Sequence, residues 1–219
     1  MDILVNNISF RSVNNGIQGT IHFNSNLIVP DSIRGYLINI NNIWSFHFNI
    51  NNINNSYAKN IKKIALILES PHINEYTNGY IPIGIAQGKT GNNINTKLIN
   101  RLRLISNLNV NTIYEVNLMN PIQYQCSCYN EFNGLVPIPN NNLINHKCSR
   151  SNTDKVFRSL FSIKQTLYID FINRLIKYKP DIIFNCCTYN LKGLVYNRIK
   201  RFINPNYCPC YHDSHPSAW

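Results

Sequence analysis

The chain has 219 residues and a mass of 25.4 kDa, which suits one well-packed domain with a small appendage and excludes two large domains. Its 21 Lys and Arg residues against 10 Asp and Glu residues give a net charge of +11. A surface with so few carboxylates favours a polyanionic partner, because basic surfaces bind phosphate backbones through counterion release. The alternative is that the excess charge serves solubility alone.

Residues 1–57 alternate apolar and polar side chains in short runs that Asn and Gly interrupt, as between Ile43 and Phe48. This period of two predicts β-strands. We therefore predict a β-rich N-terminal subdomain over residues 1–57. The pattern changes at about residue 60, so a second domain is expected over residues 58–219.

The second domain opens with alternating strand and helix patterns. The continuous apolar run from Ile64 to Leu68 is typical of a buried parallel strand. Apolar side chains then recur at helical spacing between Ile94 and Leu108. Thr112 to Leu118 is predicted as a second strand.

The same alternation continues towards the end of the sequence. Helical spacing from Val156 to Leu175 predicts a long helix that ends before Pro180. Asp181 to Cys187 is predicted as a third strand, Leu191 to Phe202 as a short basic helix, and Tyr207 to His212 as a fourth strand. This order predicts an α/β fold, a three-layer sandwich around a short four-stranded parallel sheet.

Ligands of such sheets bind beyond the carboxyl ends of the strands, so the polar residues found there are of interest. They are Glu69 to His72 after the first strand, Asn117 to Asn120 at the end of the second, and His212 to Ser217 after the fourth. Two of the ten carboxylates, Glu69 and Glu75, fall in the first of these loops.

Four short motifs follow the strands in order. Residues 68–75 read Leu-Glu-Ser-Pro-His-Ile-Asn-Glu, residues 88–91 read Gly-Lys-Thr-Gly before a helix, Val116-Asn117 ends a strand, and residues 215–217 read His-Pro-Ser. Over about residues 60–219 the chain resembles the uracil-DNA glycosylase superfamily. It is nearest to the fourth family, whose first motif reads Gly-Glu-Ala-Pro-Gly with a Glu three residues later. Any one of these motifs is weak, whereas four in the right order are more specific.

The resemblance implies catalytic roles for residues of the first and last motifs. Cleavage of an N-glycosidic bond leaves negative charge on the departing base and positive charge on the sugar. His215 would donate a hydrogen bond to the base oxygen. Ser70 stands where the best-known members have the Asp or Asn that activates water, so Glu69, Glu75 or His72 is expected to take over that work.

The resemblance also implies how the substrate is held. Asn117 would read the edge of a base flipped out of the stack. Ala86 stands where the family has an aromatic ring that stacks on uracil, which predicts a base bulkier than uracil, such as a modified pyrimidine, unless Tyr76 or Tyr80 replaces the ring. The residues expected to contact DNA are Gly88, Lys89, Gly91, Pro216, Ser217 and Trp219. The family's wedge loop after His-Pro-Ser has no counterpart here, which leaves three alternatives: Trp219 is the wedge between bases, the N-terminal subdomain is the wedge, or the substrate is single-stranded.

Each assignment has an alternative that involves no catalysis. Glu69 can be a strand-end carboxylate, His215 a loop histidine and Asn117 the cap of the next turn. The alternative function is accordingly a nucleic-acid-binding module that keeps the fold without hydrolysis. Our expectation is a DNA glycosylase that leaves an abasic site, in DNA repair or in defence against modified foreign DNA.

Metal cofactors are not expected in the glycosylase site. Members of the fourth family carry an iron–sulfur cluster on four cysteines, two of them in an N-terminal Cys-x-x-Cys, but no Cys precedes residue 126 here. A structural zinc site is the remaining candidate, with the ligands Cys126, Cys128, His146 and Cys148. The alternation of Cys208, Cys210 and His212 is better explained by buried thiols.

The sequence also sets expectations about location and partners. The N-terminal residues do not resemble a signal peptide, and no apolar stretch approaches the roughly 20 residues that span a bilayer. We therefore expect a cytoplasmic monomer whose partner is double- or single-stranded DNA and not a membrane.

Overall fold

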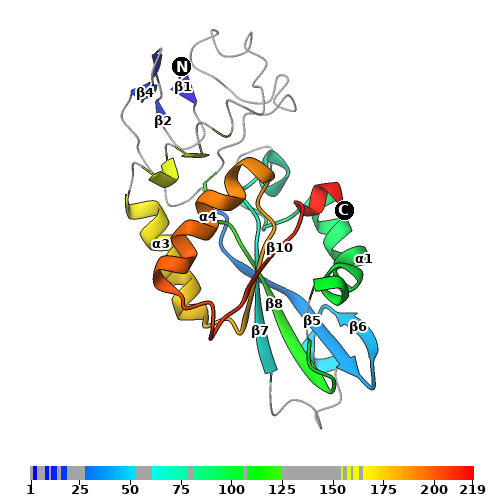
Figure 1. Ribbon diagram of the computed structural model, residues 1–219. Coiled ribbons are helices and arrows are strands. Elements are labelled where there is room, and N and C mark those ends of the chain that lie inside the picture. Colours follow the sequence, from blue (N-terminus) through cyan, green and yellow to red (C-terminus); the bar gives the residue numbers. More distant parts are fainter. Residues whose placement is uncertain are drawn as a thin grey trace.

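A computed structural model (Figure 1) describes residues 28–52, 61–77, 81–105, 108–124 and 165–219, together with four short strands before residue 19 and parts of the segment 154–162. Four strands form two small antiparallel sheets. They are β1 (Asp2–Ile3) with β2 (Ile8–Ser9), and β3 (Arg11–Val13) with β4 (Gly16–Gln18).

The main sheet has six strands in the order β10-β9-β7-β8-β5-β6. Four of them are mutually parallel: β7 (Ile61–Ile67), β8 (Thr112–Met119), β9 (Ile182–Asn185) and β10 (Cys210–His212). The other two, β5 (Ser32–Ile40) and β6 (Ile43–His47), form a hairpin that pairs antiparallel with β8. The α/β class is therefore confirmed, but the sheet is mixed and six-stranded.

The hairpin also changes the expected division of the chain. β5 and β6 lie within the segment predicted as a separate subdomain over residues 1–57, yet they belong to the same sheet as β7 and β8. The physical reason is that β8 would otherwise present an unpaired edge, and β5 covers it along seven residue pairs from Ser32 to Asn39. The sheet thus includes residues 32–47, on the N-terminal side of the expected boundary.

Three helices with described bounds cover the two faces of the sheet (Figure 1). Helix α1 (Gly88–Ile105) lies on one face, whereas α3 (Gln165–Tyr178) and α4 (Tyr189–Phe202) lie on the other. This arrangement follows from right-handed crossovers, because the chain passes from β7 to β8 in one direction and from β8 to β9 and β10 in the opposite direction. Each strand predicted in residues 58–219 has a counterpart, although β10 covers only the last three of the six residues predicted from Tyr207 to His212. The helix predicted from Val156 to Leu175 corresponds to α3, which the structure describes from Gln165 to Tyr178, and only parts of its predicted first half are described.

Alternation along β7 divides the core into two layers. Ile64, Leu66 and Leu68 pack with α1, whereas Ala65 and Ile67 pack with α3 and α4. All five side chains are almost fully buried. β7 is one of the two inner strands of the parallel part, and its carboxyl end lies between both helical layers.

Candidate functional site

The loops after β7 and β9 meet where the strand order reverses. β8 lies on one side of β7 and β9 on the other, and the connecting helices cover opposite faces. A crevice forms at such a switch point beyond the carboxyl ends of the strands. A pocket of about 400 Å³ occupies this place, a volume within the range of small-molecule sites.

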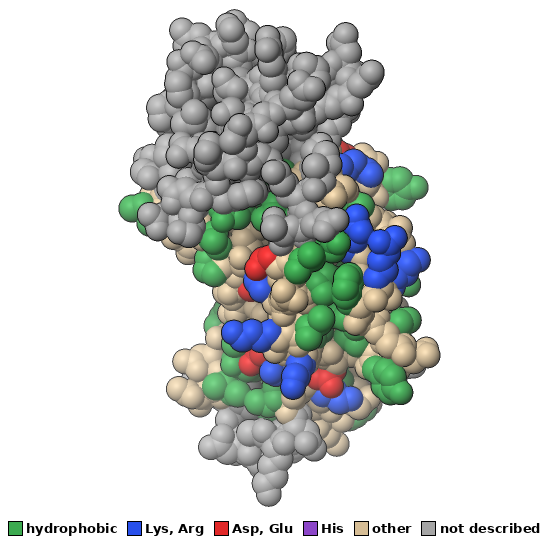
Figure 2. Space-filling model, turned by 90° about the vertical axis from the view of Figure 1, so that its left-hand side faces the viewer, with side chains coloured by type: hydrophobic (Ala, Val, Ile, Leu, Met, Phe, Trp, Pro, Cys, Tyr) green, Lys and Arg blue, Asp and Glu red, His purple; other side chains and the backbone are tan. Residues whose placement is uncertain are grey.

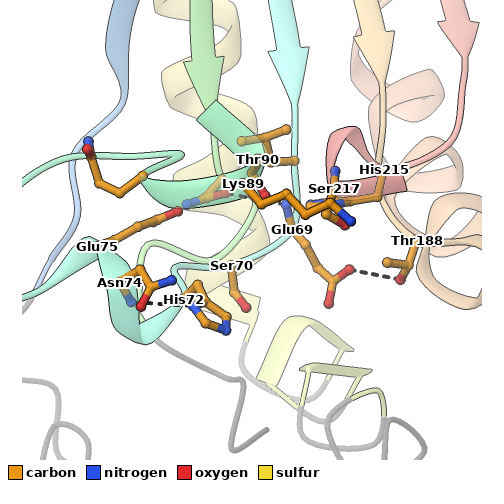
Figure 3. Close-up of a pocket in the computed structure, with 13 residues that line it drawn as sticks. Glu69, Ser70, His72, Asn74, Glu75, Lys89, Thr90, Thr188, His215 and Ser217 are labelled. Carbon is orange, nitrogen blue, oxygen red and sulfur yellow. Dashed lines mark hydrogen bonds between the residues drawn. The ribbon is translucent and has the colours of Figure 1, made fainter. Parts of the chain in front are cut away.

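Segments from both halves of the sheet line the pocket (Figure 3). The lining residues are Leu68, Glu69, Ser70, His72, Asn74, Glu75, Gln87, Lys89, Thr90, Asn120, Thr188, His215 and Ser217. All five residues predicted from the sequence as catalytic are among them, as are two of the predicted DNA contacts, Lys89 and Ser217. Residues separated by almost 150 positions in the chain thus face one cavity.

His215 begins the short 3-10 helix η6 (Pro216–Ala218) as its N-terminal cap. The backbone N–H of Ser217 donates to His215 Nδ1 over 3.3 Å, and Ser217 Oγ lies 2.9 Å from the same nitrogen. Because a backbone N–H can only donate, Nδ1 is the acceptor, and the neutral ring carries its hydrogen on Nε2. His215 is thereby prepared to donate from Nε2.

Glu69 is the first polar side chain after β7, and only 5% of it is exposed. Its Oε2 accepts a hydrogen bond from Thr188 Oγ1 over 2.8 Å, which is drawn in Figure 3. Its backbone N–H donates to Asn120 Oδ1 over 3.3 Å, just beyond β8. The loop after β7 is therefore fastened to both neighbouring strands, and the carboxylate is held at the switch point.

Thr188 was not identified from the sequence. It is the N-cap residue of α4, a position at which a threonine hydroxyl commonly accepts a hydrogen bond from the first turn. No such bond forms, and the hydroxyl donates to Glu69 instead. In the sequence Thr188 is a threonine directly before helix α4. This position indicates a helix cap as readily as a contact with Glu69.

Replacing Thr188 with valine is expected to lower kcat about tenfold for the reaction proposed below and to leave KM nearly unchanged, because the change removes one hydrogen bond that orients Glu69. Thr188→Ser keeps the hydroxyl and should restore most of the rate. Steady-state kinetics of the two variants make this test. Equal kcat values for the Val and Ser variants would contradict the orienting role.

Glu75 is buried at the edge of the pocket, with 5% of its surface exposed. Its Oε1 accepts a hydrogen bond from the backbone N–H of Ala86 over 2.8 Å, and its Oε2 has no partner among the described residues. Burial raises the pKa of Glu75 to about 8, although the hydrogen bonds from Ala86 and from the backbone at His72 act in the opposite direction. At neutral pH Glu75 is mainly protonated and is a poor base.

In the view of Figure 3, Ser70 and His72 lie on one side of the Glu69 carboxylate and Thr188 lies on the other, whereas His215 and Ser217 lie above it. The ring of His72 accepts a hydrogen bond at Nδ1 from the backbone N–H of Asn74 over 3.3 Å. The side chains of Ser70 and His72 are half-buried. Polar side chains of several segments therefore line the pocket together with the Glu69 carboxylate.

The residues predicted to hold the base are placed outside the pocket lining. Asn117 points from β8 to the face that carries α3, and its Oδ1 is buried without a partner among the described residues. Ala86 and Tyr76 are buried in the core beneath α1, and Tyr80 lies outside the described residues. Asn120, which follows β8, lines the pocket in the place expected for Asn117, because the strand continues to Met119.

The expected DNA contacts in the glycine motif are divided between surface and core. Lys89 is exposed at the start of α1, and Gly88 is exposed with a positive φ of 64°. Gly91 is buried, and a Cβ there would lie 1.9 Å from the carbonyl oxygen of Ala86. Gly91 therefore allows α1 to approach the preceding loop, a packing role that explains its presence without DNA.

Replacing Gly91 with alanine is expected to destabilise the fold by about 3 kcal/mol, because backbone atoms must move to admit the methyl group. Gly193→Ala in α4 is the matched control, since a Cβ at Gly193 meets nothing within 4 Å. That change should stabilise the protein by up to about 1 kcal/mol through helix propensity. Urea unfolding of both variants measures the difference, and similar midpoints would refute the packing argument.

Trp219 packs back against α1 and does not project as a wedge. Its indole N–H donates to the carbonyl of Ser214 over 2.9 Å, and the Arg101 guanidinium lies 5.9 Å from the ring centre. Pro216 is buried, and its carbonyl accepts from Asn93 over 2.8 Å. Both residues therefore make contacts within the protein, and their expected contacts with DNA stay predictions.

One polar stripe of α1 holds the segment that carries His215. Arg101 donates to both carboxylate oxygens of Asp213, with Nε to Oδ2 at 2.7 Å. Lys97 donates to the carbonyl of Trp219. Together with Asn93 these residues recur every four positions, so they share one helix face. His215 is thereby fixed relative to α1.

The candidate metal ligands give no metal centre within the described part of the chain. Cys126, Cys128, His146 and Cys148 lie outside the described residues. Among those that are described, no group of three or more His, Cys, Asp or Glu side chains could hold a metal ion. Cys208 is buried and Cys210 partly so, each as a free thiol.

The comparisons with known proteins return no relative. No family model, no curated protein and no solved structure matches this chain. A search of the described residues also finds no helix that is both long and apolar enough to cross a membrane.

Proposed function

We propose that the protein is a DNA glycosylase that hydrolyses the N-glycosidic bond of a flipped-out base and leaves an abasic site. The observation that carries the proposal is the placement of His215 and Glu69 on one pocket at the switch point of the sheet. The motifs that resemble the uracil-DNA glycosylase superfamily supply these same residues. The net charge of +11 suits a DNA partner.

In the proposed reaction the bond between C1′ and the base nitrogen breaks, and its electron pair leaves with the base. His215 donates from Nε2 to a base oxygen and stabilises the developing negative charge. Glu69 faces the sugar, stabilises the positive charge there and accepts a proton from the water that adds to C1′. Glu75 is mainly protonated at neutral pH, so Glu69 is the better candidate for this proton among the two carboxylates.

The pocket lining also bears on the base that is removed. Among the described residues that line the pocket, none is Phe, Tyr or Trp. A stacking ring is therefore absent from that part of the wall, which supports the hypothesis of a base bulkier than uracil, such as a modified pyrimidine. A preference for plain uracil over larger bases would contradict this hypothesis.

The test uses oligonucleotides that each carry one natural or modified pyrimidine, including uracil, thymine, 5-methylcytosine and 5-hydroxymethyluracil, as single strands and as duplexes. Incubation with protein is followed by hot alkali, which cuts the strand at abasic sites. Scission with the native protein that Glu69→Gln abolishes and Glu115→Gln preserves would support the proposal. Glu115 is the matched control because it is a half-buried carboxylate on β8 that does not line the pocket.

The alternative function is a nucleic-acid-binding module without hydrolysis. DNA binding without an abasic product on any substrate would favour this module and reject the glycosylase. Absence of both binding and product would reject both functions.

A further inference from the structure

One face of α4 carries aromatic and basic side chains outside the pocket. Tyr189, Gly193, Tyr196 and Lys200 recur at i, i+4, i+7 and i+11, a spacing that places them on one side of a helix. Beside them lie Lys192 and, from the edge strand β10, His212, whose ring centre is 4.8 Å from that of Tyr196. We call these six residues the α4 stripe.

The α4 stripe is open and suited to flat ligands. Tyr189 is 91% exposed. At Gly193, a Cβ atom added to the backbone would meet no other atom within 4 Å. The ammonium of Lys200 lies 5.5 Å from the ring centre of Tyr196. Aromatic faces and cations therefore alternate along the helix.

No salt bridge between described residues involves a basic side chain of α4. Helix α4 has four basic residues and no acidic residue. The acidic side chains of neighbouring segments have partners of their own, namely Asp154 with Asn190, Asp170 with Arg174 and Asp213 with Arg101. Figure 2, which views the side that carries α3 and α4, shows Lys and Arg side chains interspersed with hydrophobic ones. This surface is complementary to an anionic ligand with apolar faces.

The α4 stripe begins at the pocket. Thr188 lines the pocket, and Tyr189 is the next residue. From there α4 extends for 14 residues, or about 21 Å, a length that accommodates several nucleotides. β10 is the edge strand of the sheet, so no further described strand covers the stripe on the His212 side.

We propose that the α4 stripe binds single-stranded DNA next to the base held in the pocket, an inference that rests on the proposed function. Phosphates lie at Lys192 and Lys200, and bases stack on Tyr189 and over the open backbone at Gly193. Stacking on an aromatic side chain contributes about 1–3 kcal/mol per base and requires bases that are not paired. A duplex offers phosphates to the same surface but no free base faces, so the single strand is preferred.

The test is a binding measurement with a labelled oligothymidylate of roughly 16 nucleotides, the upper range of single-strand site sizes. Gly193→Glu places a carboxylate within the stripe and should weaken binding about tenfold through charge repulsion. Gly193→Gln is the matched control, since it fills the same space without charge. Both substitutions replace a helical glycine with a better helix former, so neither is expected to unfold the protein.

A second pair of variants separates stacking from charge. Tyr189→Ala should weaken binding about fivefold or more at every salt concentration, because it removes a stacking face. Lys192→Gln combined with Lys200→Gln should reduce the slope of log affinity against log salt by about 1.4, since each phosphate contact in a single strand contributes about 0.7.

Equal affinities of the Gly193→Glu and Gly193→Gln variants would overturn the inference, as would native protein that binds a duplex of the same sequence at least as tightly as the single strand. Base release is measured in parallel. If no base is released but Gly193→Glu weakens binding, the proposed function fails and the binding surface stands. If base is released but Gly193→Glu binds normally, the surface fails and the proposed function stands.

Discussion

Replacing His215 with alanine is expected to lower the rate of base release roughly 100- to 1,000-fold, the range found when one donor to a developing anion is removed. The reason is that Ser217 holds Nδ1 as an acceptor, so Nε2 is the nitrogen that can donate to the base. DNA affinity should change by less than about threefold, because the bond strengthens only as charge develops. Single-turnover kinetics with excess enzyme measure the rate, and anisotropy measures the affinity.

The control for this variant is His47→Ala. His47 is a half-buried histidine on β6 whose Nε2 lies 2.9 Å from Ser45 Oγ, a pairing with a serine two residues away that resembles the one at His215. It does not line the pocket, so base release should be unaffected. A His215→Ala variant that loses affinity and rate in equal proportion would show that His215 binds DNA and does not act on the base.

Replacing Glu75 with glutamine is expected to stabilise the protein at alkaline pH, with little change near pH 4. The folded-state pKa of about 8 lies above the ordinary value of 4.5, so the folded protein holds a proton that the unfolded chain releases. The contribution of Glu75 to the free energy of unfolding is therefore greatest below pH 4.5 and decreases as the pH rises to about 8. The two pKa values imply a loss on the order of 5 kcal/mol, which the uncharged amide avoids.

Urea unfolding at pH 5, 7 and 9 measures this difference. The gain of Glu75→Gln over the native protein should grow from pH 5 to pH 9. A constant difference across the three pH values would show that Glu75 titrates normally in the folded protein.

The parallel half of the fold could be predicted because its signals are local. The apolar run at Ile64 to Leu68 and the helical spacing after Ile94 each lie within one element. The β5–β6 hairpin could not be assigned to the same sheet, because its pairing with β8 joins segments about 80 residues apart. Alternating patterns reveal a strand but not its neighbour.

The candidate site was predictable where a motif lies directly after a strand. Glu69 and His215 are fixed to the pocket by the strands that precede them, whereas Thr188 reaches Glu69 only because β9 pairs with β7 in the sheet. Tyr76 was a candidate for stacking, but its short pairing with Pro82 belongs to a loop that turns it into the core. The burial of the Tyr76 side chain depends on tertiary contacts, which the spacing of residues in the sequence does not reveal.

The contacts of α1 with residues 213–219 have a consequence for how the pocket can move. The first turn of α1 contributes Lys89 and Thr90 to the pocket, and Asn93, Lys97 and Arg101 fasten the segment that carries His215 to the same helix. Because Gly91 has no Cβ, α1 lies close to the backbone of Ala86. The N–H of Ala86 in turn donates a hydrogen bond to Glu75. Three segments that line the pocket therefore depend on the position of α1: its own first turn, the segment that carries His215, and the loop that carries Glu75. We expect the backbone amides of these segments to exchange hydrogen together with those of α1, as one cooperative unit.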